Sequence, residues 1–252
     1  MSRIGFIGTG HIAAPMVRFL AGQGHEVCVS QRNAEVAAAL AASHGVAVLE
    51  NADVLARSDI VFLCLRPHLA EEVLRGLQFR ADQQIVSAMA GVPLARLEQL
   101  CAPATAITAT IPMVFLEHGG CPLPACPDAG PLEGLFAPEN PVLPVADEAA
   151  FNQHFAIATV VPAVLEVLAT SAAWLGHATG DDAVAEFYTA QLVAGYLANI
   201  EKAKAGALAQ ERDALATTGT LSLQMVDALR AAGVPGTVSD ALSGIGKRLE
   251  GA

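Results

Sequence analysis

Lysine is almost absent from this chain of 252 residues. Its three lysines, Lys202, Lys204 and Lys247, all lie beyond residue 200. A mechanism that needs a lysine in the first two hundred residues is therefore excluded. Positive charge is scarce in general, because 14 Lys and Arg stand against 25 Asp and Glu and leave a formal net charge of −11. That balance disfavours nucleic acid and an anionic membrane surface as partners.

Long uninterrupted apolar runs are also missing. Although 53% of the residues are hydrophobic, we find no stretch of eighteen without polar positions or breaks, so we expect no membrane span. The chain enters an apolar strand almost at its first residue and leaves no room for a signal peptide, so we expect a cytoplasmic protein. Its five cysteines are odd in number and scattered, which predicts reduced thiols and no metal site.

What is present at the N-terminus is a strand, a glycine turn and a helix, in the stretch RIGFIGTGHIAAPMVRFL. The turn spells G-x-G-x-x-A and is followed by apolar residues at helical spacing. In a dinucleotide-binding unit, the first glycine allows the tight turn, the second lets a pyrophosphate approach the backbone, and the small third residue packs helix on strand. The predicted cofactor loop comprises Gly8, Thr9, Gly10, His11 and Ile12. A plain glycine-rich turn is the alternative.

The end of the second predicted strand, HEVCVS over residues 25–30, lacks the acid that selects NAD in this fold. In its place stand Ser30, Arg32 and Asn33, whose hydroxyl, guanidinium and amide suit the additional 2′-phosphate of NADP. We therefore predict NADP, in its reduced form NADPH, as the cofactor. The alternative is that Arg32 is a solvated charge and that Asn33 only caps the helix 34–43.

Strand and helix patterns alternate through the first 150 residues and then give way to helices alone. Further strands are predicted at 46–48, 59–65, 85–90, 105–111 and 142–145, and a loop-rich segment is predicted over 117–144. We predict an α/β fold: a Rossmann-type doubly wound sheet over 1–150, then an all-helical dimerisation and substrate domain over 151–252. A single long apolar helix over 181–210 predicts a homodimer or a higher homo-oligomer of dimers.

Taken in order, short motifs of this sequence resemble those of the pyrroline-5-carboxylate reductases over the whole chain. GFIGTGHIA resembles the cofactor loop, SQRN the NADP-selecting turn, and SAMAG the segment whose backbone lies beside the nicotinamide. VVPAV resembles the start of the helical domain, and QLVAG resembles the dimer helix. Besides the residues already named, the resemblance implies cofactor contacts from Asn51, Leu65, Arg66, Pro67, Ala90, Gly91 and Pro112.

The substrate half departs from the family pattern. The segment ATIPM keeps the proline but lacks the family's arginine and asparagine, and Val164 replaces its tyrosine. The turn ATTGTL stands where the family has its carboxylate-binding S-P-G-G-T-T. By resemblance, Thr218, Gly219 and Thr220 bind the substrate, and Thr220 is the candidate catalytic residue. A helix cap by Thr218 or Thr220 explains the same residues equally well.

The reaction implied by the resemblance is hydride transfer from NADPH to the C=N bond of a small cyclic imine, as in the reduction of pyrroline-5-carboxylate in proline biosynthesis. A cyclic imine is readily protonated, so catalysis would rest mostly on positioning. Two alternatives stay open: a broader imine reductase that needs no carboxylate, and a non-catalytic NADP-binding sensor. A β-hydroxyacid dehydrogenase, which uses a lysine early in the helical domain, is excluded because no lysine occurs between Phe151 and Ile200.

Overall fold

The computed structural model describes residues 1–251 of the chain, which divides into two compact units. The first comprises Met1–Phe155 together with the chain from Gly246 onward, and the second comprises Ala156–Ile245. The sequence predicts one helical domain over 151–252, whereas the last turns of the chain pack within the first unit. There the Gln153 side chain donates a hydrogen bond from Nε2 to Oε1 of Glu250 (3.0 Å).

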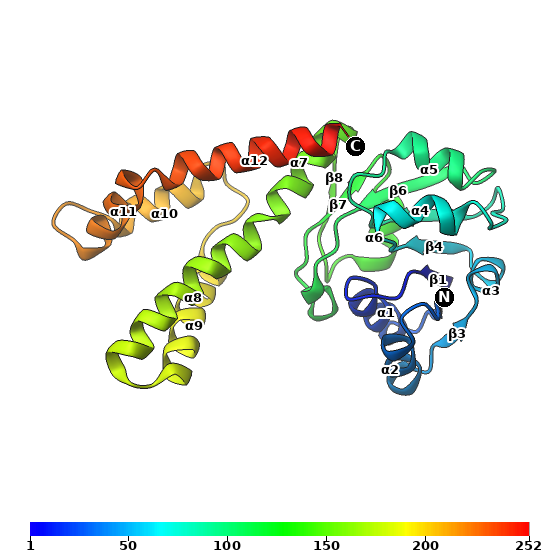
Figure 1. Ribbon diagram of the computed structural model, residues 1–252, viewed down its shortest axis with the longest axis horizontal. Coiled ribbons are helices and arrows are strands. Elements are labelled where there is room, and N and C mark those ends of the chain that lie inside the picture. The colour runs from blue at the N-terminus through cyan, green and yellow to red at the C-terminus, as the bar shows by residue number, and fades with distance from the viewer. Residues whose placement is uncertain (252) are drawn as a thin grey trace. The chain divides into compact units, whose positions relative to one another are not determined.

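A sheet of eight strands lies at the centre of the first unit (Figure 1). Its order is β3-β2-β1-β4-β5-β6-β7-β8, and all neighbouring pairs are parallel except β6 with β7. The strands are β1 (Arg3–Ile7), β2 (Glu26–Ser30), β3 (Ala47–Leu49), β4 (Ile60–Leu63), β5 (Gln84–Ser87), β6 (Ala106–Thr110), β7 (Leu123–Cys126) and β8 (Val142–Pro144). The order of β1 to β6 is that of a doubly wound sheet, with its switch point between β1 and β4. The predicted fold class is confirmed.

Helices cover both faces of this sheet (Figure 1). One hydrophobic core joins the sheet to α1, α2 and α6, and the other joins it to α3, α4 and α5. Phe62 of β4 belongs to the first core, while Val61 and Leu63 belong to the second. Because both faces of β4 are covered, its sequence is apolar without alternation. The elements are α1 (Ala13–Gly22), α2 (Ala34–His44), α3 (Asn51–Arg57), α4 (Pro67–Leu74), α5 (Leu94–Leu100) and α6 (Gly130–Phe136), with a 3-10 helix η1 (Val114–His118).

The segment 117–144 contains more regular structure than the loop-rich prediction allows. β7 pairs antiparallel with the end of β6, and α6 begins with Pro131 in its first turn. A proline in the first turn of a helix loses no intrahelical hydrogen bond, because that amide has no partner in any case. The many prolines therefore obscured a strand and a helix that they do not prevent.

The second unit is built from a chain of helices. They are α8 (Val160–Thr179), α9 (Asp182–Asn199), α10 (Ala207–Leu215) and α11 (Leu221–Ala231), while α7 (Glu148–Ala158) leads into the unit and α12 (Val234–Glu250) leads out of it. A tight turn joins α8 to α9 as a helical hairpin (Figure 1). Gly180 ends α8 in the left-handed conformation, with φ +78°, and Asp181 caps α9 by accepting a hydrogen bond from the Val184 amide (3.0 Å).

The prediction of one helix over 181–210 is wrong. α9 ends at Asn199, and Ile200 has extended backbone with ψ 155°. α10 begins only after Gly206, which adopts the left-handed conformation with φ +79°. Glycine takes that conformation without steric cost, so Gly206 can hold the left-handed turn directly before α10.

One stretch bears on the expectation that the chain has no membrane span. Glu148–Thr179, which contains α7 and α8, is long and apolar enough to cross a membrane by length and composition alone. Its few polar residues leave the mean hydropathy within the range of membrane-spanning helices. Only 11% of its most apolar window is buried within the chain. A single helix of this kind is weak evidence for a membrane, because a helix covered by a second subunit has the same composition.

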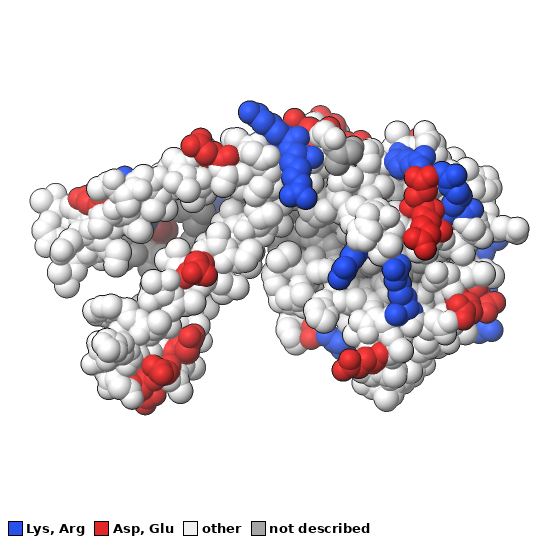
Figure 2. Space-filling model, in the orientation of Figure 1, with Lys and Arg blue, Asp and Glu red and all other residues white. Residues whose placement is uncertain are grey.

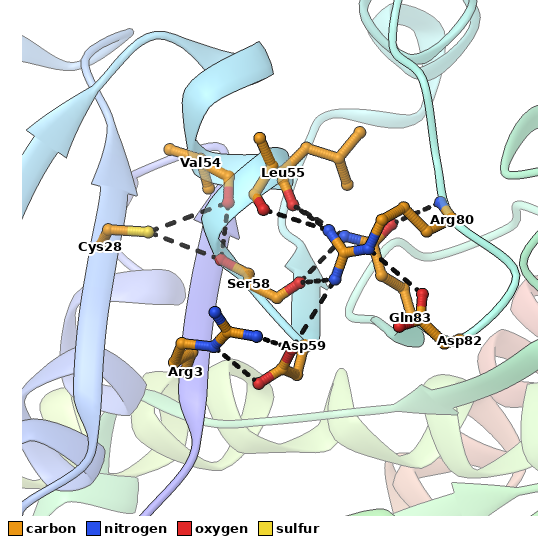
Figure 3. Close-up of polar contacts among 10 residues, drawn as sticks. Arg3, Cys28, Val54, Leu55, Ser58, Asp59, Arg80, Asp82 and Gln83 are labelled. Atoms are coloured by element: carbon orange, nitrogen blue, oxygen red, sulfur yellow. Dashed lines mark hydrogen bonds and ion pairs between the residues drawn. The ribbon is translucent and has the colours of Figure 1, made fainter.

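The C-terminal end of α3 is held by side chains that precede β5 (Figure 3). Arg80 donates to the carbonyl oxygens of Ala56 (3.1 Å) and Ser58 (3.0 Å). The fully buried Gln83 donates from Nε2 to the carbonyl oxygens of Leu55 (2.7 Å) and Ser58 (3.0 Å), and its Oε1 accepts from the Arg80 amide (2.8 Å). The last carbonyls of a helix lack the partners that a further turn would supply, so these contacts provide donors for the acceptors at the end of α3.

We expect Gln83→Leu to lower the free energy of unfolding by about 3 kcal/mol. The backbone amide of Arg80 and the carbonyl oxygens of Leu55 and Ser58 each lose a hydrogen-bond partner in this variant. Urea unfolding followed by circular dichroism measures the change. The matched control is Gln99→Leu on the exposed side of α5, for which we expect a change below about 0.5 kcal/mol. Equal stabilities of the two variants would contradict the role given to Gln83.

Candidate cofactor site

A pocket of about 440 Å³ lies where β1, β2 and β4 end. These strands are parallel neighbours, so the loops that follow them meet at one edge of the sheet, beside the switch point where such folds bind ligands. The pocket brings together three of the predicted stretches, and its lining is Gly8, Thr9, Gly10, Arg32, Asn33, Ala34, Cys64, Leu65, Arg66 and Leu69.

The two glycines of the loop have different structural roles. Gly8 has φ +96°, and a Cβ built on it would lie 2.5 Å from the carbonyl oxygen of Cys64, so the protein itself requires glycine there. A Cβ on Gly10 would meet no atom within 4 Å. Packing within the chain therefore does not require glycine at position 10, and the open space above it leaves room for a phosphate to approach the backbone.

The N-terminus of α1 offers free backbone donors beside this pocket. Ala14 is the first residue whose amide bonds back to the loop, to the carbonyl oxygen of Gly10 (2.9 Å). Within residues 1–251, the amides of Gly10, His11, Ile12 and Ala13 have no acceptor, and no side chain caps the helix. Unpartnered amides together with the helix dipole attract an anion, so a diphosphate fits this end of α1.

Two arginines line the same pocket. The side chains of Arg32 and Arg66 are exposed, and neither guanidinium has an ion-pair or hydrogen-bond partner in the described part of the chain. Asn33 lines the same pocket, and its Oδ1 accepts a hydrogen bond from the Val36 amide (3.4 Å) as the cap of α2. The capping role foreseen for Asn33 is therefore confirmed, and the NH2 group of its side-chain amide stays available to a ligand. Two unpaired guanidiniums suit a dianionic phosphate.

The remaining predicted cofactor residues lie outside this pocket. His11 and Ile12 are exposed in the loop itself, Asn51 is the first residue of α3, and Pro67 is the first residue of α4. Ala90 and Gly91 follow β5 at the same edge of the sheet, and Pro112 is buried just after β6. Gly91 lines a separate pocket of about 260 Å³ that includes Glu148 and Leu249. Their contacts with a cofactor remain predictions.

Sequence reasoning missed three of the lining residues, Ala34, Cys64 and Leu69. Ala34 and Cys64 are chain neighbours of the predicted Asn33 and Leu65, so adjacency was the available signal for them. Leu69 lies one place further on, two residues after Pro67 in the first turn of α4. Burial raises the pKa of the Cys64 thiol to about 12, so this group stays protonated at neutral pH and is no nucleophile. Within residues 1–251 all five cysteines are free, and no cluster of His, Cys, Asp and Glu is suited to a metal.

The predicted substrate turn lies in the second unit, directly before α11. Gly219 has φ +85°, and Thr220 caps the helix, because its Oγ1 accepts from the Leu223 amide (3.2 Å) and donates to the carbonyl oxygen of Thr217 (2.8 Å). The amides of Leu221 and Ser222 have no acceptor within the described residues. The capping alternative is thus present in the structure, and two backbone donors remain for an anion.

Comparison with known proteins extends these observations. Residues 3–91 match the family model described as NADP oxidoreductase coenzyme F420-dependent. A sequence search among curated proteins finds no match. Among solved structures, pyrroline-5-carboxylate reductase from Streptococcus pyogenes superposes with a TM-score of 0.86 at 21% identity, over 100% of this chain and 99% of that one. The fold is that of a pyrroline-5-carboxylate reductase.

Two further structures define how far this likeness reaches. The pyrroline carboxylate reductase of Plasmodium falciparum, solved with NADP bound, gives a TM-score of 0.83 at 15% identity over 99% of this chain and 97% of that one. An imine reductase from Pseudomonas sp. gives 0.64 at 17% identity over 97% and 92% of the two chains. The pyrroline-5-carboxylate reductase fold therefore extends over the whole chain, and at these identities the likeness establishes the fold alone.

Proposed function

We propose that this chain is an NADPH-dependent reductase of a cyclic imine, and that its substrate is pyrroline-5-carboxylate or a related imino acid. The observation that carries the proposal is the pocket at the edge of the sheet, where unpartnered amides of α1 adjoin Arg32 and Arg66. The solved proteins of the same fold support it, because their names include pyrroline-5-carboxylate reductases and an imine reductase.

The residues of this pocket fit the parts of NADPH. The free amides from Gly10 to Ala13 would hold the diphosphate, and Arg32, Asn33 and Arg66 would hold the 2′-phosphate. By resemblance, Asn51 adjoins the adenosine, while the backbone of Ala90 and Gly91 adjoins the nicotinamide. When bound, the reduced nicotinamide supplies a hydride to the carbon of the C=N bond.

The protein's own contribution is binding and orientation. In the turn before α11, the amides of Leu221 and Ser222 would receive the substrate carboxylate, as a backbone nest receives an anion. The Thr220 hydroxyl, whose proton is directed at the Thr217 carbonyl oxygen, would fix the shape of this turn. Because a cyclic imine is readily protonated, the reaction requires no strong acid from the protein, only a fixed position of the imine.

We also propose that the chain works as a cytoplasmic homodimer, or as a higher oligomer of dimers, assembled through its helical unit. Large apolar side chains stand exposed on α8 and α9, and the visible face of these helices in Figure 2 carries few charges. They are Val161, Val164, Leu165, Val167, Trp174, Val184, Phe187, Tyr188, Leu192, Tyr196 and Leu197. Monomeric proteins rarely expose so much apolar surface. A second copy of the chain would bury these side chains in a dimer interface.

A second candidate function is reduction of imines that lack a carboxylate. The altered motif around Gly219 favours it, as does the fold shared with an imine reductase. A non-catalytic NADPH-binding sensor is the third reading. It would bind NADPH without oxidising it in the presence of any cyclic imine.

We expect the protein to oxidise NADPH faster with pyrroline-5-carboxylate than with 2-methylpyrroline, because only the former carries a carboxylate for the turn. Absorbance of NADPH under identical conditions measures both rates. Thr220→Ala is expected to lower kcat/KM for the carboxylate substrate about tenfold, while Thr220→Ser, which keeps the cap, retains activity. Equal or better turnover of 2-methylpyrroline would instead identify the broader imine reductase, and tight NADPH binding without turnover would identify the sensor.

A further inference from the structure

Ser30 occupies a different place from the one its sequence position indicates. The sequence predicts that its hydroxyl meets the 2′-phosphate of NADP. In the structure the residue is 1% exposed and does not line the pocket. Its Oγ accepts a hydrogen bond from the Gly8 amide (2.9 Å), and its carbonyl oxygen accepts one from Oγ1 of Thr9 (2.6 Å). Thr9 is equally buried, with 2% exposure.

These contacts hold the cofactor loop from one side, and β4 holds it from the other. Gly8 packs against the Cys64 carbonyl so closely that a Cβ there would lie 2.5 Å from it. The loop is therefore fixed between the ends of β2 and β4. Its next residues, from Gly10 onward, carry the free amides that open α1. Ser30 therefore contacts the two loop residues that directly precede those amides.

A serine has the right chemistry for this role. Its oxygen accepts the Gly8 N–H, and its proton has the Thr9 Oγ1 as partner at 3.4 Å. An aspartate in this position could accept the same N–H, but it would also place a negative charge beside the phosphates. A neutral hydroxyl meets the buried amide without that repulsion.

We propose that Ser30 and Thr9 are a positioning pair that sets affinity for the dinucleotide as a whole, and that discrimination between NADPH and NADH belongs to Arg32 and Arg66. This inference rests on dinucleotide binding as part of the proposed function, but not on imine reduction. It assigns to Ser30 a role shared by both cofactors, because the diphosphate that meets the α1 amides is common to both.

The test is titration calorimetry of the full chain with NADPH and, separately, with NADH. For Ser30→Ala we expect both dissociation constants to rise by the same factor, about tenfold for one buried hydrogen bond, with their ratio unchanged. For Thr9→Val we expect the same pattern, and for the double variant a combined effect smaller than the product of the two. Thr9→Ser, which keeps the hydroxyl, should bind both cofactors like the natural protein.

Ser58→Ala is the matched control, because Ser58 is also 1% exposed and its Oγ also bonds to backbone, at the Val54 carbonyl (2.6 Å) before β4. It should leave both dissociation constants unchanged, even if stability falls. A loss confined to NADPH in Ser30→Ala would show direct phosphate contact and overturn the positioning role, as would no loss for either cofactor. The Thr9 variants decide the question if Ser30→Ala fails to fold. NADPH binding without imine turnover would refute the proposed reaction and leave this inference standing, whereas a natural protein that binds neither dinucleotide would refute both.

Discussion

NADPH is expected to bind about 10- to 100-fold more tightly than NADH, and Arg32→Asp is expected to erase or reverse that preference. The reason is charge: Arg32 lines the pocket with no partner of its own, so its guanidinium is free to pair with a 2′-phosphate. An aspartate there would repel that phosphate and could accept hydrogen bonds from the free hydroxyls of NADH. Titration with each cofactor gives the two dissociation constants.

The control for this change is Arg75→Asp. Arg75 is an exposed arginine after α4 that pairs with Glu71 and does not line the pocket. Arg75→Asp alters the net charge by the same amount as Arg32→Asp. Any change in cofactor affinity that the two variants share is therefore a long-range effect of charge and not the loss of a contact. Equal affinity of the natural protein for NADPH and NADH would refute the assignment of Arg32 as the selecting residue.

The second large effect is expected at the surface of the helical unit. The natural protein should be a dimer at micromolar concentration, and Phe187→Asp should convert it to a monomer. The Phe187 side chain is 70% exposed on α9, and burying a ring of this size at an interface contributes about 2 kcal/mol that a buried carboxylate would forfeit. Light scattering coupled to size exclusion measures the mass of each species.

Val48→Asp is the matched substitution outside the helical unit. Val48 is 37% exposed on the edge strand β3, where a charge is well tolerated, so this variant should stay dimeric. A natural protein that is a stable monomer would refute the proposed dimer. Recovery of the natural protein with the membrane fraction would point instead to the apolar stretch Glu148–Thr179 as a membrane segment.

The Rossmann-type sheet was predictable from sequence because its signals are local. A G-x-G-x-x-A turn between an apolar strand and a helix fixes the start, and unalternating strands such as β4 indicate two covered faces. The break between α9 and α10 was not predictable in the same way. Residues on both sides of it are good helix formers, and only the left-handed Gly206 marks the new start. The strand β7 was missed because three prolines in or beside it resemble a loop.

The candidate cofactor site shows a similar division. The sequence assigned Arg32, Asn33 and Arg66 to cofactor binding, and the structure brings them to one pocket, because residues that follow parallel strands meet at one edge of a sheet. It could not tell which polar atoms face the pocket. Ser30 and Arg32 are two residues apart, yet the serine side chain is buried against Gly8 while the arginine is exposed. That difference depends on the loop packed against β2, which no local pattern encodes.

The last turns of α12 pack on α7, so the first unit includes residues that the ribosome translates last. Gly246 lies so close to Gln153 that a Cβ there would come within 2.9 Å of Oε1, and Leu249 lines the pocket beside Gly91. A ribosome releases the eight-stranded sheet long before it releases these residues, and domains generally begin to fold as they emerge. The sheet can therefore assemble early, but its unit is completed only by the final turns of the chain, after every helix of the second unit has been translated.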